Sequence, residues 1–200
     1  MNPDVDFESA RQYILSRLEA QLPATLLYHG VHHTRDDVLP AVERLGARAG
    51  LVPEALLTLR TAALYHDTGY LVTYFRNEDE GAQIARETLP NFGYGPEQIE
   101  SVSALIMATR LPQEPEDYFQ ALICDADLDS LGREDFLQSS LLLRTELITH
   151  GVETTLREWY ARQIAFLTTH SYFSREARAL RNAGKARNLA RLRELLAEMS

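Results

Sequence analysis

Three separated stretches of the chain carry histidine and aspartate in combinations that could bind a divalent cation. The first, YHGVHHTRDDV, contains three histidines, the second, AALYHDTGY, contains an adjacent histidine and aspartate, and the third, CDADLDSLG, contains three aspartates. Imidazole nitrogen and carboxylate oxygen together form a donor set that borderline and hard divalent cations bind. One imidazole from the first stretch, the His–Asp pair and one aspartate from the third would supply four ligands. Positions would remain for water, as in a catalytic metal site.

These ligands must be positioned by helices, because the chain shows helical periodicity and no alternating strand pattern. Adjacent His66 and Asp67 would point about 100° apart on a helix, so both can reach one ion only near a helix end, and Gly69 predicts such an end. Apolar residues recur at steps of three and four along most of the chain. We predict an all-α protein of about eight helices, at residues 7–22, 53–68, 78–89, 96–109, 117–128, 133–149, 153–169 and 174–198.

Composition supports a globular protein of ordinary size. The chain has 200 residues, of which 45% are hydrophobic, and no apolar run reaches the roughly 18–20 residues that a membrane span needs. Its first residues are acidic and do not form a signal peptide, and Cys124 has no partner for an internal disulfide. We expect a cytoplasmic protein with no membrane partner. It would form a single domain, 1–200, with a metal-site core at 25–132 and a helical cover at 133–200.

Charge is distributed unevenly along the chain. The net charge of −9 argues against a duplex nucleic acid as partner. Residues 175–200 nevertheless carry a net charge of +4, whereas the remaining 174 residues carry −13. The basic last helix could present a solvated face, fold back onto acidic surface, or bind an anionic ligand.

The strings around the candidate ligands resemble those of the HD-domain superfamily, helical metal-dependent phosphohydrolases named for their His…His-Asp…Asp ligands. The similarity is greatest to small stand-alone bacterial members with the strings YHxxxHT, HDxGY, E-xx-GA and DADL-xx-LG, which stand here at residues 28–34, 66–70, 78–82 and 125–132. The resemblance implies a helical HD-domain bundle and one divalent ion, which could be Mn, Mg, Fe, Ni, Co or Zn. It also implies hydrolysis of a phosphate ester or anhydride of a small molecule, with a nucleotide expected.

The resemblance also assigns the metal ligands, which would be His33, His66, Asp67 and Asp127. Asp127 is preferred to Asp125 because it follows the small Ala126, as the last ligand does in the superfamily. Asp125 would then orient a ligand or a bound water, although the reverse assignment stays open. The chain has no histidine between Asp67 and Asp127. We therefore expect one ion and not two, which also argues against the di-iron oxygenase branch of the superfamily.

Catalytic roles follow from the same motifs. Tyr28-His29 resembles the Tyr-His of cyclic nucleotide phosphodiesterases, in which the histidine is the general acid. The alternative for His29 is a supporting or core residue. Asp67 could accept the proton of the attacking water, and Glu78 is a second candidate base. Glu78 could instead stabilise the positive end of its helix.

Several residues are candidates for contact with the substrate in this acidic protein. Tyr70 could stack on a base or merely pack against its neighbours. Positively charged side chains suit phosphate, and the candidates are Arg110, Arg178, Arg181 and Lys185. A homodimer is compatible with the sequence. The alternative function is a non-catalytic ligand-sensing or interaction module that retains the metal site.

Overall fold

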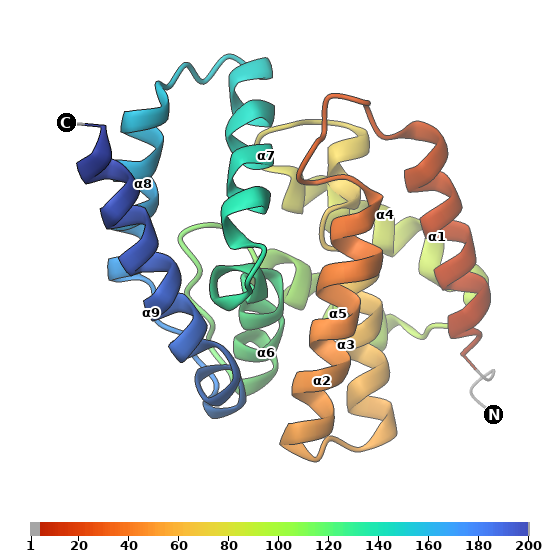
Figure 1. Cartoon of the computed structure of the whole chain (residues 1–200). Helices are drawn as coiled ribbons and strands as arrows, with labels where there is room; N and C mark the ends of the chain where they lie inside the picture. The colour runs from red at the N-terminus through yellow and green to blue at the C-terminus, as the bar shows by residue number, and fades with distance from the viewer. Residues whose placement is uncertain (1–4, 200) are drawn as a thin grey trace.

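The computed structural model describes residues 5–199, and α-helices dominate it (Figure 1). The α-helices are α1 (Phe7–Gln21), α2 (Leu39–Ala49), α3 (Pro53–Tyr65), α4 (Asn77–Thr88), α5 (Pro96–Ala108), α6 (Tyr118–Asp127), α7 (Phe136–Thr149), α8 (Leu156–Thr169) and α9 (Arg175–Glu198). Short turns of other helix types are η1 (a π-helix, His33–Val38) and the 3-10 turns η2 (Thr68–Leu71), η3 (Leu89–Phe92) and η4 (Asp129–Gly132). The described residues contain no strand, which confirms the predicted all-α class.

Helix α2 is the element that the sequence reasoning missed. It continues directly from the π-helix η1, and Pro40 lies in its first turn, where a missing backbone N–H is tolerated. Leu39, Val42 and Leu45 face the core, and Gly50 ends the helix in the left-handed conformation, with φ of 67°.

Helix α3 is the central element of the bundle. It contacts α1, α2, α4, α5 and α6. Its last turn, from Ala62 to Tyr65, is fully buried, and His66 follows at once. Burial on all sides fixes the direction in which this helix delivers the His–Asp pair.

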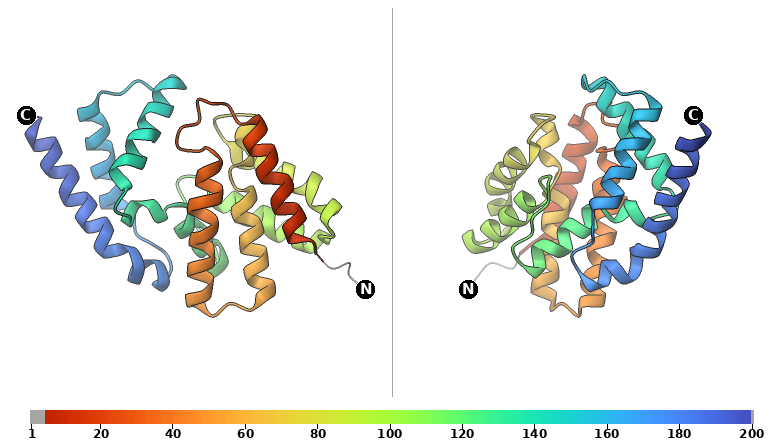
Figure 2. Two further views of the ribbon diagram at one scale, coloured as in Figure 1. Left: turned by 45° about the vertical axis from the view of Figure 1, so that its right-hand side comes forward. Right: turned by 90° about the vertical axis from the view of Figure 1, so that its left-hand side faces the viewer.

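Helices α7, α8 and α9 lie together on the side of the molecule away from α1 (Figure 2). Helix α9 packs against α8 and against η4, the 3-10 turn that follows α6. Ser174 caps α9, because its side chain accepts a hydrogen bond from the amide N–H of Ala177. The core cluster includes residues of α8 and α9 as well as residues of α1 to α6. Among the described residues, no helix combines the length and the apolar character that crossing a membrane requires.

Two glycines permit the close approach of α9 to η4. A Cβ atom at Gly184 would lie 1.9 Å from the carbonyl oxygen of Gly132. A Cβ atom at Gly132 would in turn lie 2.5 Å from the carbonyl oxygen of Arg181. Because both obstacles are backbone atoms, any larger residue would push α9 away from the turn that follows Asp127.

Substitution Gly184→Ala should therefore destabilise the protein by about 1–3 kcal/mol or more, despite the better helix propensity of alanine. The matched control is Gly95→Ala, where the nearest atom to a new Cβ is 3.7 Å away, and φ of −81° suits alanine. Urea unfolding measures both variants. Equal loss of stability in the two would contradict this account of the helix contact.

Candidate metal centre

The ends of three elements converge on one point. His33 begins η1, His66 and Asp67 follow α3, and Asp127 is the last residue of α6. One ligand atom each from His33, His66 and Asp127 lies within 4.8 Å of the others. The structure thus brings together residues that are 94 positions apart in the sequence, and this cluster could hold a metal ion.

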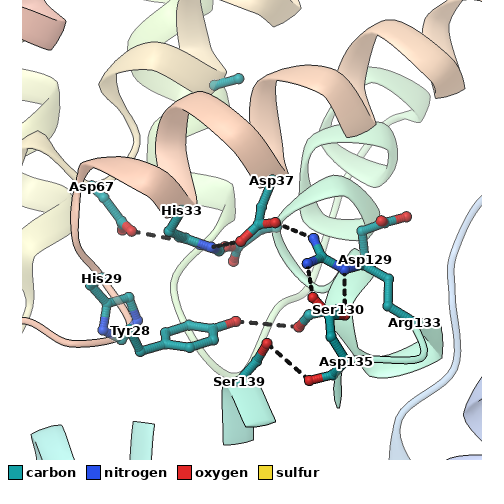
Figure 3. A network of polar contacts seen from close by, with 12 residues as sticks. Tyr28, His29, His33, Asp37, Asp67, Asp129, Ser130, Arg133, Asp135 and Ser139 are labelled. Carbon is teal, nitrogen blue, oxygen red and sulfur yellow. Dashed lines mark hydrogen bonds and ion pairs between the residues drawn. The ribbon is translucent and has the colours of Figure 1, made fainter. Parts of the chain in front are cut away.

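Asp67 lies beside the same three residues and completes the cluster. Its Oδ2 atom lies 3.1 Å from His66 Nε2 and 3.8 Å from His33 Nε2. Asp127 Oδ1 lies 3.3 Å from His33 Nε2 and 3.6 Å from His66 Nε2. Figure 3 shows Asp67 and His33 facing each other, with His29 and Tyr28 beside them. The four side chains that the HD resemblance assigns as ligands are therefore neighbours.

The hydrogen-bonding state of His66 tests whether a cation fits. His66 Nδ1 lies 2.8 Å from the carbonyl oxygen of Ala63, so Nδ1 carries a proton and donates it. In the neutral ring, Nε2 is then an acceptor that faces two carboxylate oxygens, which are acceptors as well. His66 Nε2 and Asp67 Oδ2 are both buried without a hydrogen-bond partner. Acceptors aimed at one another are stable only with positive charge between them, so the donor set fits a divalent cation.

Electrostatics at the cluster favour positive charge. Burial alone would lower the pKa of His66, but Asp67 and Asp127 overcome this and raise it above its ordinary value. Burial would likewise raise the pKa of Asp67, yet the imidazoles of His66, His29 and His33 hold it well below its ordinary value. The site therefore stabilises a cation in spite of its low exposure.

Neutral amides hold the two carboxylates from behind. Asn77 Nδ2 donates to Asp67 Oδ1 at 3.4 Å, and Gln113 Nε2 donates to Asp127 Oδ2 at 3.1 Å. In each case the other carboxylate oxygen is the one that faces the histidines. Such outer contacts orient metal ligands without neutralising them.

A chain of charged groups supports His33 from the opposite side (Figure 3). Asp37 Oδ2 lies 3.7 Å from His33 Nδ1, and its other oxygen accepts a hydrogen bond from Arg133, which also bonds Asp135. Burial opposes ionisation of Asp37, but His33 and Arg133 lower its pKa to about 2. A carboxylate behind a metal-binding imidazole fixes its ring and increases its basicity.

Glycine in the HDTGY string has a structural cause. A Cβ atom at Gly69 would lie 1.7 Å from the carbonyl oxygen of Asn77. The turn η2 therefore lies directly against the start of α4, which places the Asn77 amide on Asp67. Gly69 thus permits the close backbone contact that positions Asn77 at the candidate metal centre.

His29 lies beside the cluster and is held by a glutamate that the sequence analysis did not single out. Glu146, from α7, is fully buried and accepts hydrogen bonds from His29 Nδ1 at 2.5 Å and from Tyr74 Oη at 3.1 Å. It also accepts from the backbone N–H groups of Tyr28 and His29. Burial would raise the pKa of Glu146, but the His29 imidazole lowers it below its ordinary value. Nothing in its local sequence, LLLRTELIT, which also contains Arg144 and two threonines, distinguishes Glu146 from other polar residues on helices.

The other expected residues near the centre line one cavity of about 650 Å³. Tyr70 lines it and stacks on the His29 ring, with centroids 4.6 Å apart. Glu78 lines it from the first turn of α4 and pairs with Arg110 at 3.2 Å. Asp67, Asp127 and His29 also open onto this cavity. It joins the candidate metal centre to space for a small molecule.

Three expected phosphate-binding residues lie elsewhere, because the basic helix α9 folds back onto acidic and carbonyl groups. Arg181 donates to both oxygens of Asp129 at 2.7 and 2.6 Å. Arg178 donates to the carbonyl oxygens of Tyr172 and Phe173, and Lys185 donates to that of His170. Among the described residues, none of these three cations lines the cavity. The structure thus favours the second alternative for the basic segment, in which it meets the acidic surface.

Asp125 also faces away from the ligand cluster. Its two carboxylate oxygens accept hydrogen bonds from the backbone N–H groups of Phe173 and Ser174, at 2.8 and 2.7 Å. The side chain therefore ties α6 to the start of α9. These contacts differ from the expected role of orienting a ligand or water. Asp125 and Asp127 are two positions apart on α6, so their side chains project to nearly opposite sides of the helix.

Comparison with known proteins supports the fold. No protein-family model matches the chain, and no curated protein matches it. A crystal structure of a predicted HD superfamily hydrolase from an uncultured Thermotogales bacterium is similar, with a TM-score of 0.64. The match covers 94% of this chain and 92% of that chain, at 19% sequence identity. This chain therefore has the HD-domain fold, and the comparison confirms the predicted resemblance at that level.

Removing a ligand should abolish tight metal binding. Substitutions His33→Ala, His66→Ala and Asp127→Asn should each weaken binding of Mn²⁺ or Co²⁺ by more than about 100-fold, since loss of outer partners alone costs about 10–100-fold. Exposed His32 provides the control, and His32→Ala should leave affinity unchanged. Titration calorimetry with elemental analysis measures affinity and stoichiometry. More than one tightly held ion per chain would contradict the mononuclear assignment.

Proposed function

We propose that this chain is a metal-dependent hydrolase that cleaves a phosphate ester or anhydride of a small molecule. The observation that carries the proposal is the His/Asp cluster, whose unpaired acceptor atoms meet at the wall of a cavity that also contains His29. The HD-domain fold supports it, because the similar structure is described as a predicted hydrolase. Nucleotides are the first substrates to assay.

The metal would be held by His33, His66, Asp67 and Asp127. When bound, a divalent ion supplies Lewis acidity toward a phosphoryl oxygen and lowers the pKa of water. Asp67 would accept the proton of the attacking water, with Glu78 as the second candidate base. Glu78 forms an ion pair with Arg110, and this pairing offsets the negative charge of the Glu78 carboxylate. Asp67 is therefore the favoured base.

His29 would donate a proton to the departing oxygen. Glu146 engages Nδ1, which leaves Nε2 as the nitrogen available to a substrate. Stacking on Tyr70 restricts rotation of the ring. The hydrogen bond between Nδ1 and the buried Glu146 carboxylate fixes the ring from its other edge.

A phosphate-ester panel tests the proposed hydrolase. Protein loaded with Mn²⁺, Co²⁺, Ni²⁺ or Mg²⁺ should hydrolyse at least one nucleotide or phosphate ester, and Asp67→Ala should remove the activity. Full metal occupancy without turnover on any ester would instead favour the ligand-sensing module. Release of inorganic phosphate measures monoesterase or anhydride cleavage, and chromatography of products detects diester cleavage.

Substitution His29→Ala should slow turnover by about 10²–10⁴-fold on esters with alkyl leaving groups, because those oxygens require protonation. On p-nitrophenyl phosphate, whose leaving group departs as a stable anion, the loss should be much smaller. Metal affinity should stay unchanged. An equal loss on both kinds of ester would show that His29 only supports the structure.

A further inference from the structure

Facing sides of α7 and α8 form an apolar wall of the cavity. The apolar residues of these helices that line it are Phe136, Leu143 and Leu147 of α7 and Phe166 of α8, and Leu128 and Leu131 extend the wall from the segment between α6 and α7. Within the described residues, no charged side chain of α7 or α8 lines the cavity. Together with Ser139 and Ser140, which also line the cavity, the residues from α7 recur at steps of three and four, so one stripe of that helix faces the cavity. An apolar wall of this kind binds the apolar or aromatic body of a ligand.

Charge in the same cavity is limited. The acidic residues that line it are Asp67, Glu78 and Asp127, and the arginines that line it are Arg76 and Arg110. A divalent ion would be offset by Asp67 and Asp127, the carboxylates proposed to hold it. A protonated His29 would likewise be offset by Glu146, with which it pairs. The remaining positive charge would then come from the arginines, less the negative charge of Glu78.

Both arginines are already paired. Arg110 lies 2.7 Å from Asp79 and 3.2 Å from Glu78, and Arg76 lies 3.6 Å from Asp79. Polyphosphate binding usually uses several free arginine or lysine side chains, because each further phosphate adds negative charge. The cavity offers enough positive charge for one phosphate at the metal and little for a second or third.

Three polar side chains of α7 and α8 interrupt the apolar wall, and two of them are already bonded: Ser140 accepts a hydrogen bond from Trp159, and Ser139 donates one to the carbonyl oxygen of Asp135. Gln163 of α8 is only 9% exposed, and its side-chain amide makes no hydrogen bond among the described residues. The amide opens onto the cavity, so both its donor and its acceptor are available to a ligand. Phe166 lies less than one helical turn further along α8.

We propose, on the basis of the proposed function, that the substrate is a monophosphate ester whose body is flat and largely apolar and carries one hydrogen-bonding edge. The phosphate lies at the metal centre, the body packs between α7 and α8, and Gln163 binds the polar edge. A nucleoside monophosphate and a non-nucleotide aryl phosphate share this chemistry. Nucleoside di- and triphosphates do not.

Binding of phosphonates, which are not hydrolysed, tests the substrate class without relying on turnover. With Mn²⁺ present, phenylphosphonate should bind about tenfold or more tightly than methylphosphonate, because only its ring contacts the apolar wall. A methylene analogue of adenosine triphosphate should bind more weakly than phenylphosphonate. Titration calorimetry measures all three. Equal affinity for the phenyl and methyl compounds, or tightest binding of the triphosphate analogue, would overturn the proposal.

Two leucines of α7 form a matched pair. Leu143→Asn should weaken phenylphosphonate binding by about tenfold and leave methylphosphonate unchanged. Leu141→Asn, at a 38% exposed position outside the cavity lining, should change neither. Equal losses for both ligands in Leu143→Asn would contradict the apolar contact. The comparison of phosphonates in the unmodified protein does not depend on how this variant folds.

Gln163→Leu distinguishes the two sources of substrate. If the substrate is a nucleotide, one nucleoside monophosphate should be hydrolysed fastest, and Gln163→Leu should lower its kcat/KM by about tenfold while 1-naphthyl phosphate is unaffected. If it is an aryl phosphate, every nucleoside monophosphate should be slower than 1-naphthyl phosphate. Phenyl selectivity without any hydrolysis would refute the proposed function but support this inference. Hydrolysis that is fastest on triphosphates would support the proposed function but refute this inference.

Discussion

The structure depends on one constraint at the His/Asp cluster. Buried hydrogen-bond acceptors there face one another with no proton between them. His66 donates its Nδ1 proton to the carbonyl oxygen of Ala63, so its Nε2 points a lone pair at Asp67 and Asp127. Such an arrangement is unfavourable in a buried place unless positive charge is present. The bundle maintains it because α3 is packed on every side, and the direction of the His–Asp pair cannot relax.

Support for the centre comes from neutral and charged groups in different ways. Amides from Asn77 and Gln113 orient the carboxylates and leave their charge intact. Charged partners act on the imidazoles, with Asp37 behind His33 and Glu146 behind His29. This division keeps negative charge at the metal ligands, and the hydrogen bond to Glu146 fixes the orientation of the His29 ring.

The last three helices contribute to the site as well as covering it. Glu146 on α7 holds His29, and the walls of α7 and α8 complete the cavity. Helix α9 contributes indirectly, because its Arg181 neutralises Asp129 and its Gly184 permits close contact with η4. Arg178 and Lys185 bond backbone carbonyls, so these three cations add no positive charge to the cavity.

Local patterns in the sequence were sufficient to predict helices and the identity of the candidate ligands. Apolar periodicity predicted the all-α class, and the three stretches rich in histidine and aspartate predicted one shared site. The resemblance to the HD-domain superfamily, and not the spacing, selected His33, His66, Asp67 and Asp127 as its candidate ligands, which the structure places at element ends. Helix α2 was missed because a π-helix precedes it and obscures its start. The supporting residues Glu146, Gln113 and Asp37 carry no local signal that distinguishes them from other polar residues on helices.

Tertiary structure alone decided which polar groups meet. Arg178, Arg181 and Lys185 suited phosphate by residue type, yet they bond Asp129 and backbone carbonyls, because the packing of α9 on η4 determines their neighbours. Asp125 and Asp127 are alike in the sequence, but their directions on α6 separate them. Asp125 binds the backbone before α9, whereas Asp127 reaches the histidines. Residue type and spacing determine what chemistry a side chain can do, and long-range packing determines which partner it finds.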